Sequence, residues 1–183
     1  MTNKIYIIIF LIILKFSLIA NAKANEQFNF DITEIEILEN GNLFKGIKRG
    51  TVTSNTGIII DANYFEYNKS LNQLRAEGNV QIIDSKKNYK IISDSIVYLK
   101  NLEVIKTKGN SKAISNNVII YGDAFEYNKN TNILKAKNKV KIFDEIENVS
   151  IFSDDITYNK NQELIFSKGK TISEINQKYN FVS

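Results

Sequence analysis

The 183-residue chain contains no cysteine and no histidine. Disulfide bonds, thiolate nucleophiles and imidazole groups for metal binding or acid–base catalysis are therefore excluded. Residues 1–22 contain two of its 24 basic residues, Lys4 and Lys15, and without this segment the chain has 22 basic and 20 acidic residues. The remaining chain is nearly neutral with interspersed signs, which argues against a nucleic-acid partner.

Residues 1–24 are predicted to be a secretory signal peptide. Lys4 precedes an apolar run, Ile5 to Leu14, and two small-residue cleavage sites end at Ala22 and Ala24. An uncleaved membrane anchor is the alternative, because the run continues past Lys15, although a spanning helix needs about 20 apolar residues. We expect an exported chain in which residues 25–183 form one domain.

Residues Phe28 to Gly50 contain a degenerate first copy of a repeat that becomes clear further along the chain. The copy reads Ile37-Phe44-Lys48, and Glu39 takes a position that lysine holds in the later copies. The stretch Gly50 to Gly57, GTVTSNTG, is rich in small polar residues. We predict a loop there, inside the domain.

The rest of the chain repeats with a period of 60 residues. Phe65-Glu66-Tyr67-Asn68-Lys69 returns as Phe125-Glu126-Tyr127-Asn128-Lys129. Each unit is a doublet of copies 29 to 31 residues apart, in which Tyr precedes Leu or Ile by seven residues and Gly or Asn by eleven. Such a period is typical of stacked units that bury one another's apolar faces. The copies are Tyr67-Leu74-Gly78, Tyr98-Ile105-Gly109, Tyr127-Leu134-Asn138 and Tyr158-Ile165-Gly169.

Each copy is predicted to be a β-hairpin. Stretches such as Lys139-Val140-Lys141-Ile142 alternate polar and apolar residues, which is the period of a half-buried strand. Clusters such as Asn128-Lys129-Asn130 follow each Tyr, and Asn tolerates the positive φ of turns. No sustained helical period follows residue 25, so we expect an all-β fold built from hairpins of about 30 residues.

Carboxylate pairs such as Asp154-Asp155 are present, but nothing in the sequence marks a catalytic or metal site. Asp94 and Asp154 recur beside serines at equivalent repeat positions, and a repeated position is usually structural. Asp61 and Asp123 are interpreted as turn-capping groups, since they lie in no Asp-rich nonapeptide. We expect no enzymatic activity, no metal and no cofactor.

Two regular features remain as candidate sites. Aromatic residues recur in stripes that form either a packed core or the wall of a groove for an apolar ligand. Lysines recur two residues after each Tyr, where they either prevent edge-to-edge aggregation or contact phosphates of an anionic lipid. These possible phosphate-facing residues are Lys69, Lys100, Lys129 and Lys160.

A family resemblance is carried by the first clean copy. GIIIDANYFEYNK, residues 57–69, leads into Leu74-Arg75-Ala76-Glu77-Gly78-Asn79-Val80, and together these resemble the OstA-like family, which includes LptA and the amino-terminal domain of LptD. The second copy departs from the pattern with Asn138-Lys139 in place of Gly-Asn. The resemblance covers most of residues 28–175 and implies a twisted antiparallel β-jellyroll, open at both ends and along a seam.

The resemblance also implies a function. It implies a periplasmic module, associated with the outer membrane, that binds lipopolysaccharide and joins other Lpt jellyroll domains by end-to-end strand addition in a bridge between the membranes. A role like that of LptA, LptC or a truncated LptD is left open. The competing interpretation is a structural or adhesive secreted β-repeat protein with a closed core. In the lipid interpretation, the acyl chains of lipid A would contact Val80, Ile82, Ile96, Tyr98, Phe125, Tyr127, Val140, Ile142, Ile156 and Tyr158.

Overall fold

The computed structural model describes residues 27–175 and 179–182. The predicted signal peptide lies outside these residues and stays a prediction. The described part consists of strands joined by short turns, with two three-residue 3-10 helices, η1 (Glu39–Gly41) and η2 (Lys100–Leu102). Neither of these helices has the length and apolar character that crossing a membrane requires.

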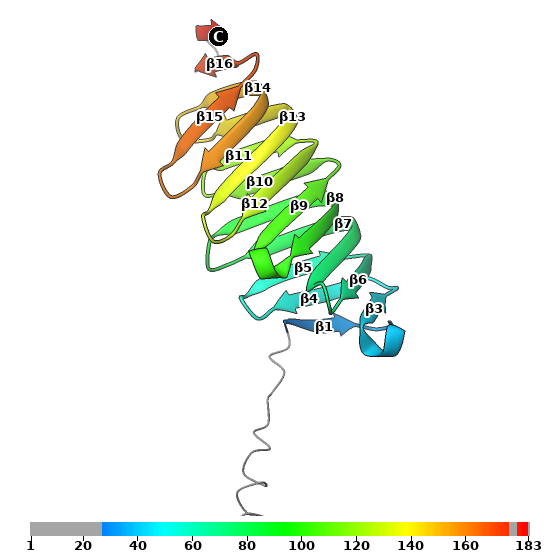
Figure 1. Ribbon diagram of the computed structural model, residues 1–183. Helices are drawn as coiled ribbons and strands as arrows, with labels where there is room; N and C mark the ends of the chain where they lie inside the picture. Colours follow the sequence, from blue (N-terminus) through cyan, green and yellow to red (C-terminus); the bar gives the residue numbers. More distant parts are fainter. Residues whose placement is uncertain (1–26, 176–178, 183) are drawn as a thin grey trace, which may run out of the picture.

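The described strands stack into an elongated, twisted ladder, with the first strands at one end and the last at the other (Figure 1). Every pairing between neighbours is antiparallel. In chain order the strands are β1 (Phe28–Ile32), β2 (Ile35–Leu38), β3 (Leu43–Gly46), β4 (Gly50–Ser54), β5 (Ile58–Ala62), β6 (Tyr64–Asn68), β7 (Gln73–Asp84), β8 (Tyr89–Leu99), β9 (Val104–Lys108), β10 (Ser111–Ser115), β11 (Val118–Gly122), β12 (Ala124–Asn128), β13 (Ile133–Asp144), β14 (Val149–Asn159), β15 (Leu164–Lys168), β16 (Ile172–Ile175) and β17 (Tyr179–Val182).

Four long strands divide the sheet into two wings, because each passes from one wing to the other. The first half of β7 pairs with β6, and its second half pairs with β5. We call the wing that contains β2, β3, β6, β9, β12 and β15 wing A, and the wing that contains β1, β4, β5, β10, β11, β16 and β17 wing B. The strands β7, β8, β13 and β14 belong to both, which makes the fold a β-jellyroll.

The predicted hairpin repeat is confirmed by the strand register. In each wing A hairpin the repeat Tyr lies opposite the Leu or Ile that follows it by seven residues, as in Tyr67 opposite Leu74 and Tyr158 opposite Ile165. The degenerate copy has the same geometry, since Ile37 lies opposite Phe44. Glu39 therefore begins its turn at the position that lysine takes in the four later hairpins.

The Gly or Asn that ends each copy forms the corner between the wings. In β7 the register shifts between Glu77 and Val80, and Gly78 and Asn79 have φ values of 78° and 50°. Such a bulge bends a strand and increases its twist, which lets one strand serve both wings. Asn138 takes the Gly78 position in β13 at a φ of 62°, which explains why Asn can replace Gly in the repeat.

The stretch Gly50 to Gly57 is not one loop, as the sequence had suggested. Its first five residues are β4, which pairs with β1 on one side and with β5 on the other. Thr51, Val52 and Thr53 alternate their side chains between the two faces of the sheet, and Val52 is fully buried. The turn is confined to the residues that follow Ser54, because β-branched side chains favour the strand despite the flanking small residues.

The core lies between the two wings and is continuous along the ladder. Aromatic pairs join the wings directly. Phe28 of β1 makes an edge contact with Tyr67 of β6, at 4.9 Å between ring centroids, and Tyr89 of β8 stacks on Tyr127 of β12 at 4.6 Å. Each hairpin therefore covers apolar surface that the opposite wing would otherwise expose to water.

Candidate functional site

The ten residues predicted to line a lipid groove all lie on the inner faces of the two wings. None of the ten is more than 4% exposed, and all belong to one cluster of buried side chains. The structure therefore brings these residues together, as the alternation of the strands predicted. In this structure they are packed against one another as a core. Whether they contact acyl chains stays a prediction.

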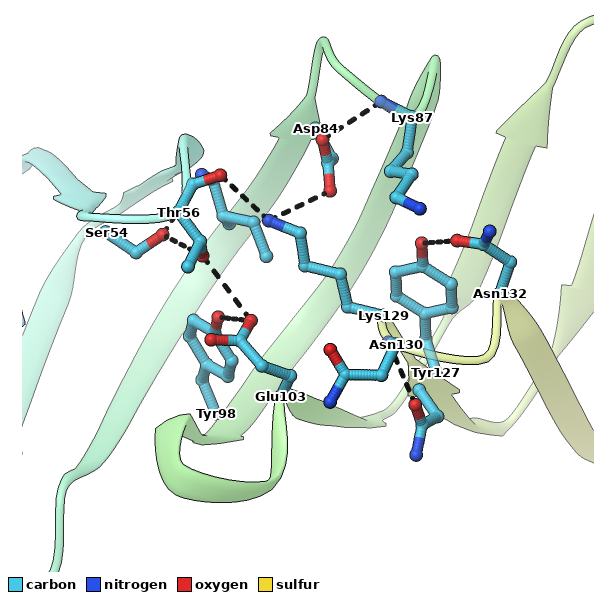
Figure 2. A network of polar contacts seen from close by, with 12 residues as sticks. Ser54, Thr56, Asp84, Lys87, Tyr98, Glu103, Tyr127, Lys129, Asn130 and Asn132 are labelled. Carbon is cyan, nitrogen blue, oxygen red and sulfur yellow. Dashed lines mark hydrogen bonds and ion pairs between the residues drawn. The ribbon is translucent and has the colours of Figure 1, made fainter.

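The side of the jellyroll opposite the corners is a seam, where turns of wing A face turns of wing B. The central contact is made by Lys129, at the end of β12 (Figure 2). Its Nζ donates a hydrogen bond to the Thr56 carbonyl oxygen at 2.9 Å and forms an ion pair with Asp84 Oδ2 at 3.4 Å. Both charged side chains are less than 10% exposed. This lysine thus links two turns that lie 73 residues apart in the sequence.

A second contact crosses the seam beside the first. Lys100 forms an ion pair with Glu103, and its Nζ also lies 3.5 Å from Thr56 Oγ1 in wing B. Glu103 additionally accepts a hydrogen bond of 2.6 Å from the Tyr98 hydroxyl (Figure 2). The Lys100 charge is compensated although the side chain is only 5% exposed.

Lys160 closes the seam one hairpin further along. Its Nζ donates to the backbone carbonyl oxygens of Lys87 and Asn88, the latter at 3.1 Å, and lies 5.2 Å from the centre of the Tyr89 ring. Burial lowers the pKa of Lys160 below its ordinary value, although the negative charge of Asp84 acts in the opposite direction. We name Lys100, Lys129 and Lys160 the seam lysines.

The four repeat lysines therefore differ in their surroundings. The seam lysines are directed across the seam, whereas the side chain of Lys69 is exposed. A phosphate contact by any of the four stays a prediction. For Lys100 and Lys129, such a contact would compete with a carboxylate that already binds the ammonium group, Glu103 in the first case and the buried Asp84 in the second.

Sequence reasoning missed the acceptors of the seam lysines. Neither Asp84 nor Thr56 was predicted to have a role in a site, and Thr56 lay inside the expected loop. The repeat did contain a pattern that points to one acceptor, Glu103. The residue five positions after each repeat Tyr alternates between Asn and Glu, as Asn72, Glu103, Asn132 and Glu163. All four have positive φ and follow the lysine in the same turn.

Tyrosine hydroxyls line the inner side of the seam. Burial, together with the hydrogen bond to Glu103, raises the pKa of Tyr98 above its ordinary value near 10.0. Burial raises the pKa of Tyr127 as well, and the negative charge of Asp84 acts in the same direction. These hydroxyls are neutral at physiological pH and act as hydrogen-bond donors that position the turn residues.

The comparisons with known proteins support the fold. No protein-family model matches the chain, and no curated protein matches its sequence. Among solved structures, the chain is similar to LptH of Pseudomonas aeruginosa, described as the LptA-homologous periplasmic component of the conserved lipopolysaccharide transport device. The two are 15% identical, with a TM-score of 0.57 over 62% of this chain and 83% of LptH. At this identity the likeness shows a shared jellyroll fold.

Proposed function

We propose that the chain is a periplasmic module of lipopolysaccharide transport that holds acyl chains between its two wings and joins other jellyrolls end to end. The observation that carries this proposal is the jellyroll itself, which is shared with a periplasmic transport component over most of that component's length. The proposed mechanism is passive and non-catalytic. Burial of apolar chains contributes about 25 cal/mol per Å², so the energy for directional movement comes from elsewhere.

The ends of wing A support end-to-end docking. Among the described strands, β2 pairs only with β3 and β15 pairs only with β14, so each has an edge free for another strand. Both strands also expose apolar side chains, which is unusual for an edge that faces only water. A partner jellyroll that added a strand at either end would cover them. These exposed residues are Ile35, Ile37 and Leu38 on β2 and Leu164 and Phe166 on β15.

Lipid entry in this proposal occurs at the seam. The corner side is closed by continuous backbone, whereas the seam is closed by side chains that can exchange partners. The acyl chains would displace inner side chains from one another and separate the wings. The seam lysines would then be released close to the phosphates of lipid A, for which an ammonium group is a suitable point-charge partner.

A structural or adhesive β-repeat protein with a closed core is the second candidate. The specific observation in its favour is the packed interior, in which the ten candidate groove residues are at most 4% exposed. In that case the seam lysines serve stability alone, and no lipid enters between the wings.

Photocrosslinking separates the two candidates. A benzoylphenylalanine is placed at Tyr98 or Tyr127, and the purified protein is irradiated with lipopolysaccharide. The matched control is the same replacement at Tyr121, whose side chain is 38% exposed on the outer face of β11. We expect adducts from the two inner positions and not from Tyr121. Adducts from none of the three, in protein that keeps its circular dichroism spectrum, would favour the closed core.

A further inference from the structure

A pocket of about 320 Å³ lies at the seam near the carboxyl-terminal end of the ladder. Its polar lining comes from turns of both wings. Wing B contributes the β10–β11 and β13–β14 turns, and wing A contributes the β14–β15 turn. The polar residues that line it include Ser115, Asn116, Asp144, Glu147, Tyr158 and Glu163.

This pocket is the 60-residue repeat of the site that holds Lys129. Asp144 corresponds to Asp84, and Glu163 corresponds to Glu103, each at the same place in its turn. Likewise Tyr158 corresponds to Tyr98, and Asn116 to Thr56. The pocket thus has the acceptor groups of a seam lysine site.

The acceptors of the pocket are arranged to receive a cation. Hydrogen bonds to the Asp144 carboxylate from the described residues all end on Oδ1, as the turn N–H of Lys87 ends on Oδ1 of Asp84, whose Oδ2 pairs with Lys129. Burial alone would raise the pKa of Asp144, but these hydrogen bonds outweigh it and lower the pKa, which keeps the group ionised at neutral pH. Ser115 Oγ is buried, at 3% exposure, without a hydrogen-bond partner, whereas Ser54 Oγ at the equivalent strand end accepts one from the backbone.

The charge balance is more negative than at the first site. Glu147 stands where the first site has Lys87. Within residues 27–175, no ion pair reaches Asp144, Glu147 or Glu163. Lys160, the repeat equivalent of Lys100, does not compensate them, because its Nζ binds the carbonyl oxygens of the β7–β8 turn.

We propose that this pocket receives a lysine-bearing or arginine-bearing hairpin turn from a partner jellyroll that continues wing A at β15. The inference deepens the proposed end-to-end docking and rests on it. A partner whose first wing A hairpin pairs with β15 would bring its turn to the pocket, in the way that the β12–β13 turn brings Lys129 to Asp84. A second copy of this chain is disfavoured, because its first hairpin presents Glu39 at that position.

The chain can itself serve as the probe. Glu39→Lys gives the first hairpin the missing cation, and sedimentation equilibrium measures self-association of the purified protein. We expect the association constant to rise about tenfold over the unchanged chain, which is typical of one close charge pair. The matched control is Glu36→Lys, which makes the same charge change on the same hairpin but outside the turn, and it should leave association unchanged.

Two second-site changes test the pocket itself. Adding Asp144→Asn or Glu163→Gln to Glu39→Lys should remove the gain in the association constant. Glu163→Gln is included because Asp144 also accepts hydrogen bonds within its turn, which Asp144→Asn can loosen. Equal association of Glu39→Lys and Glu36→Lys, or a gain that survives both second changes, would overturn the inference. Lipopolysaccharide crosslinking from Tyr127 in the same variants reports separately on the proposed function. It should be unaffected, so the two failures can be told apart.

Discussion

The corner and the seam of the jellyroll close the same interior by different means. At the corner, continuous backbone turns through residues such as Gly78 and Asn79, which hold positive φ inside β7. At the seam, the closure consists of side chains from turns far apart in the sequence, such as the buried pair of Lys129 and Asp84. The difference indicates where the molecule can open. Parting the wings at the corner breaks strand pairing, whereas parting them at the seam breaks a few polar contacts.

The corner and the seam also differ in whether a ligand can replace their polar contacts. Ser93 of the corner is buried and directs its short hydroxyl to the backbone carbonyl oxygens of Lys108 and Gly109, where a ligand has no access to it. Lys160 of the seam also binds carbonyl oxygens, yet it is a long, half-buried side chain. A ligand that offers phosphate oxygens could replace those carbonyls without disturbing a strand.

The largest expected effect comes from leaving a seam carboxylate without its cation. Lys129→Met keeps most of the side-chain volume but strips Asp84, which is 2% exposed, of its partner. We expect a loss of about 3 kcal/mol in the free energy of unfolding, as is typical of a buried pair from which one member is removed. Urea titration with a circular dichroism signal measures it.

A double-mutant cycle sharpens this result. Adding Asp84→Asn to Lys129→Met removes the buried charge and should restore much of the lost stability, because the two changes are strongly non-additive. Lys48→Met is the control, since its ion pair with Glu34 is largely exposed and should contribute less than about 1 kcal/mol. Equal losses from Lys129→Met and Lys48→Met would show that the seam contact adds nothing.

The corner is tested by adding a side chain to a glycine. Gly109 has a φ of 82°, and a Cβ there would overlap the Asp94 carboxylate. Gly41 has a φ of 87° with open space around it. We expect Gly109→Ala to cost about 2 kcal/mol and Gly41→Ala about 1 kcal/mol, the latter from backbone strain alone. Thermal unfolding of the two variants gives the difference, and identical shifts would contradict a crowded corner.

A smaller effect is expected from the seam tyrosines at alkaline pH. Because burial raises the pKa of Tyr98 and Tyr127 in the folded state, their stabilising contribution is complete below the unfolded value near 10.0 and is lost as the pH rises beyond it. Tyr98→Phe removes one titrating group and one hydrogen bond, which costs about 1 kcal/mol at neutral pH. It should flatten the decline between neutral and alkaline pH. A decline of unchanged slope would show that Tyr98 does not drive it.

Contacts between residues that are close in the sequence could be predicted, whereas contacts between distant residues could not. The wing A hairpins were predictable, because Tyr67 and Leu74 are close in sequence and recur with the same spacing. Strand β4 was missed, since Gly50 and Ser54 resemble loop residues and only pairing with β1 and β5 makes the segment a strand. The seam lysines were identified by residue, but not their acceptors, because Thr56 lies 73 residues before Lys129 and no local pattern links the two.

A small effect on stability, but the most direct test of access, is expected from Lys160. Lys160→Met removes contacts with the carbonyl oxygens of Lys87 and Asn88 but leaves no buried carboxylate unpaired. The expected loss is therefore about 1 kcal/mol. If the seam is the route between the wings, the variant should nevertheless bind the apolar dye phenylnaphthylamine more strongly than the unchanged chain does. Gly41→Ala, with a similar loss of stability at an exposed turn, controls for general loosening. Stronger dye binding by Lys160→Met alone would locate the opening at the seam. Equal dye binding by both variants would assign the binding to partial unfolding, and the seam and the corner would then not differ in function.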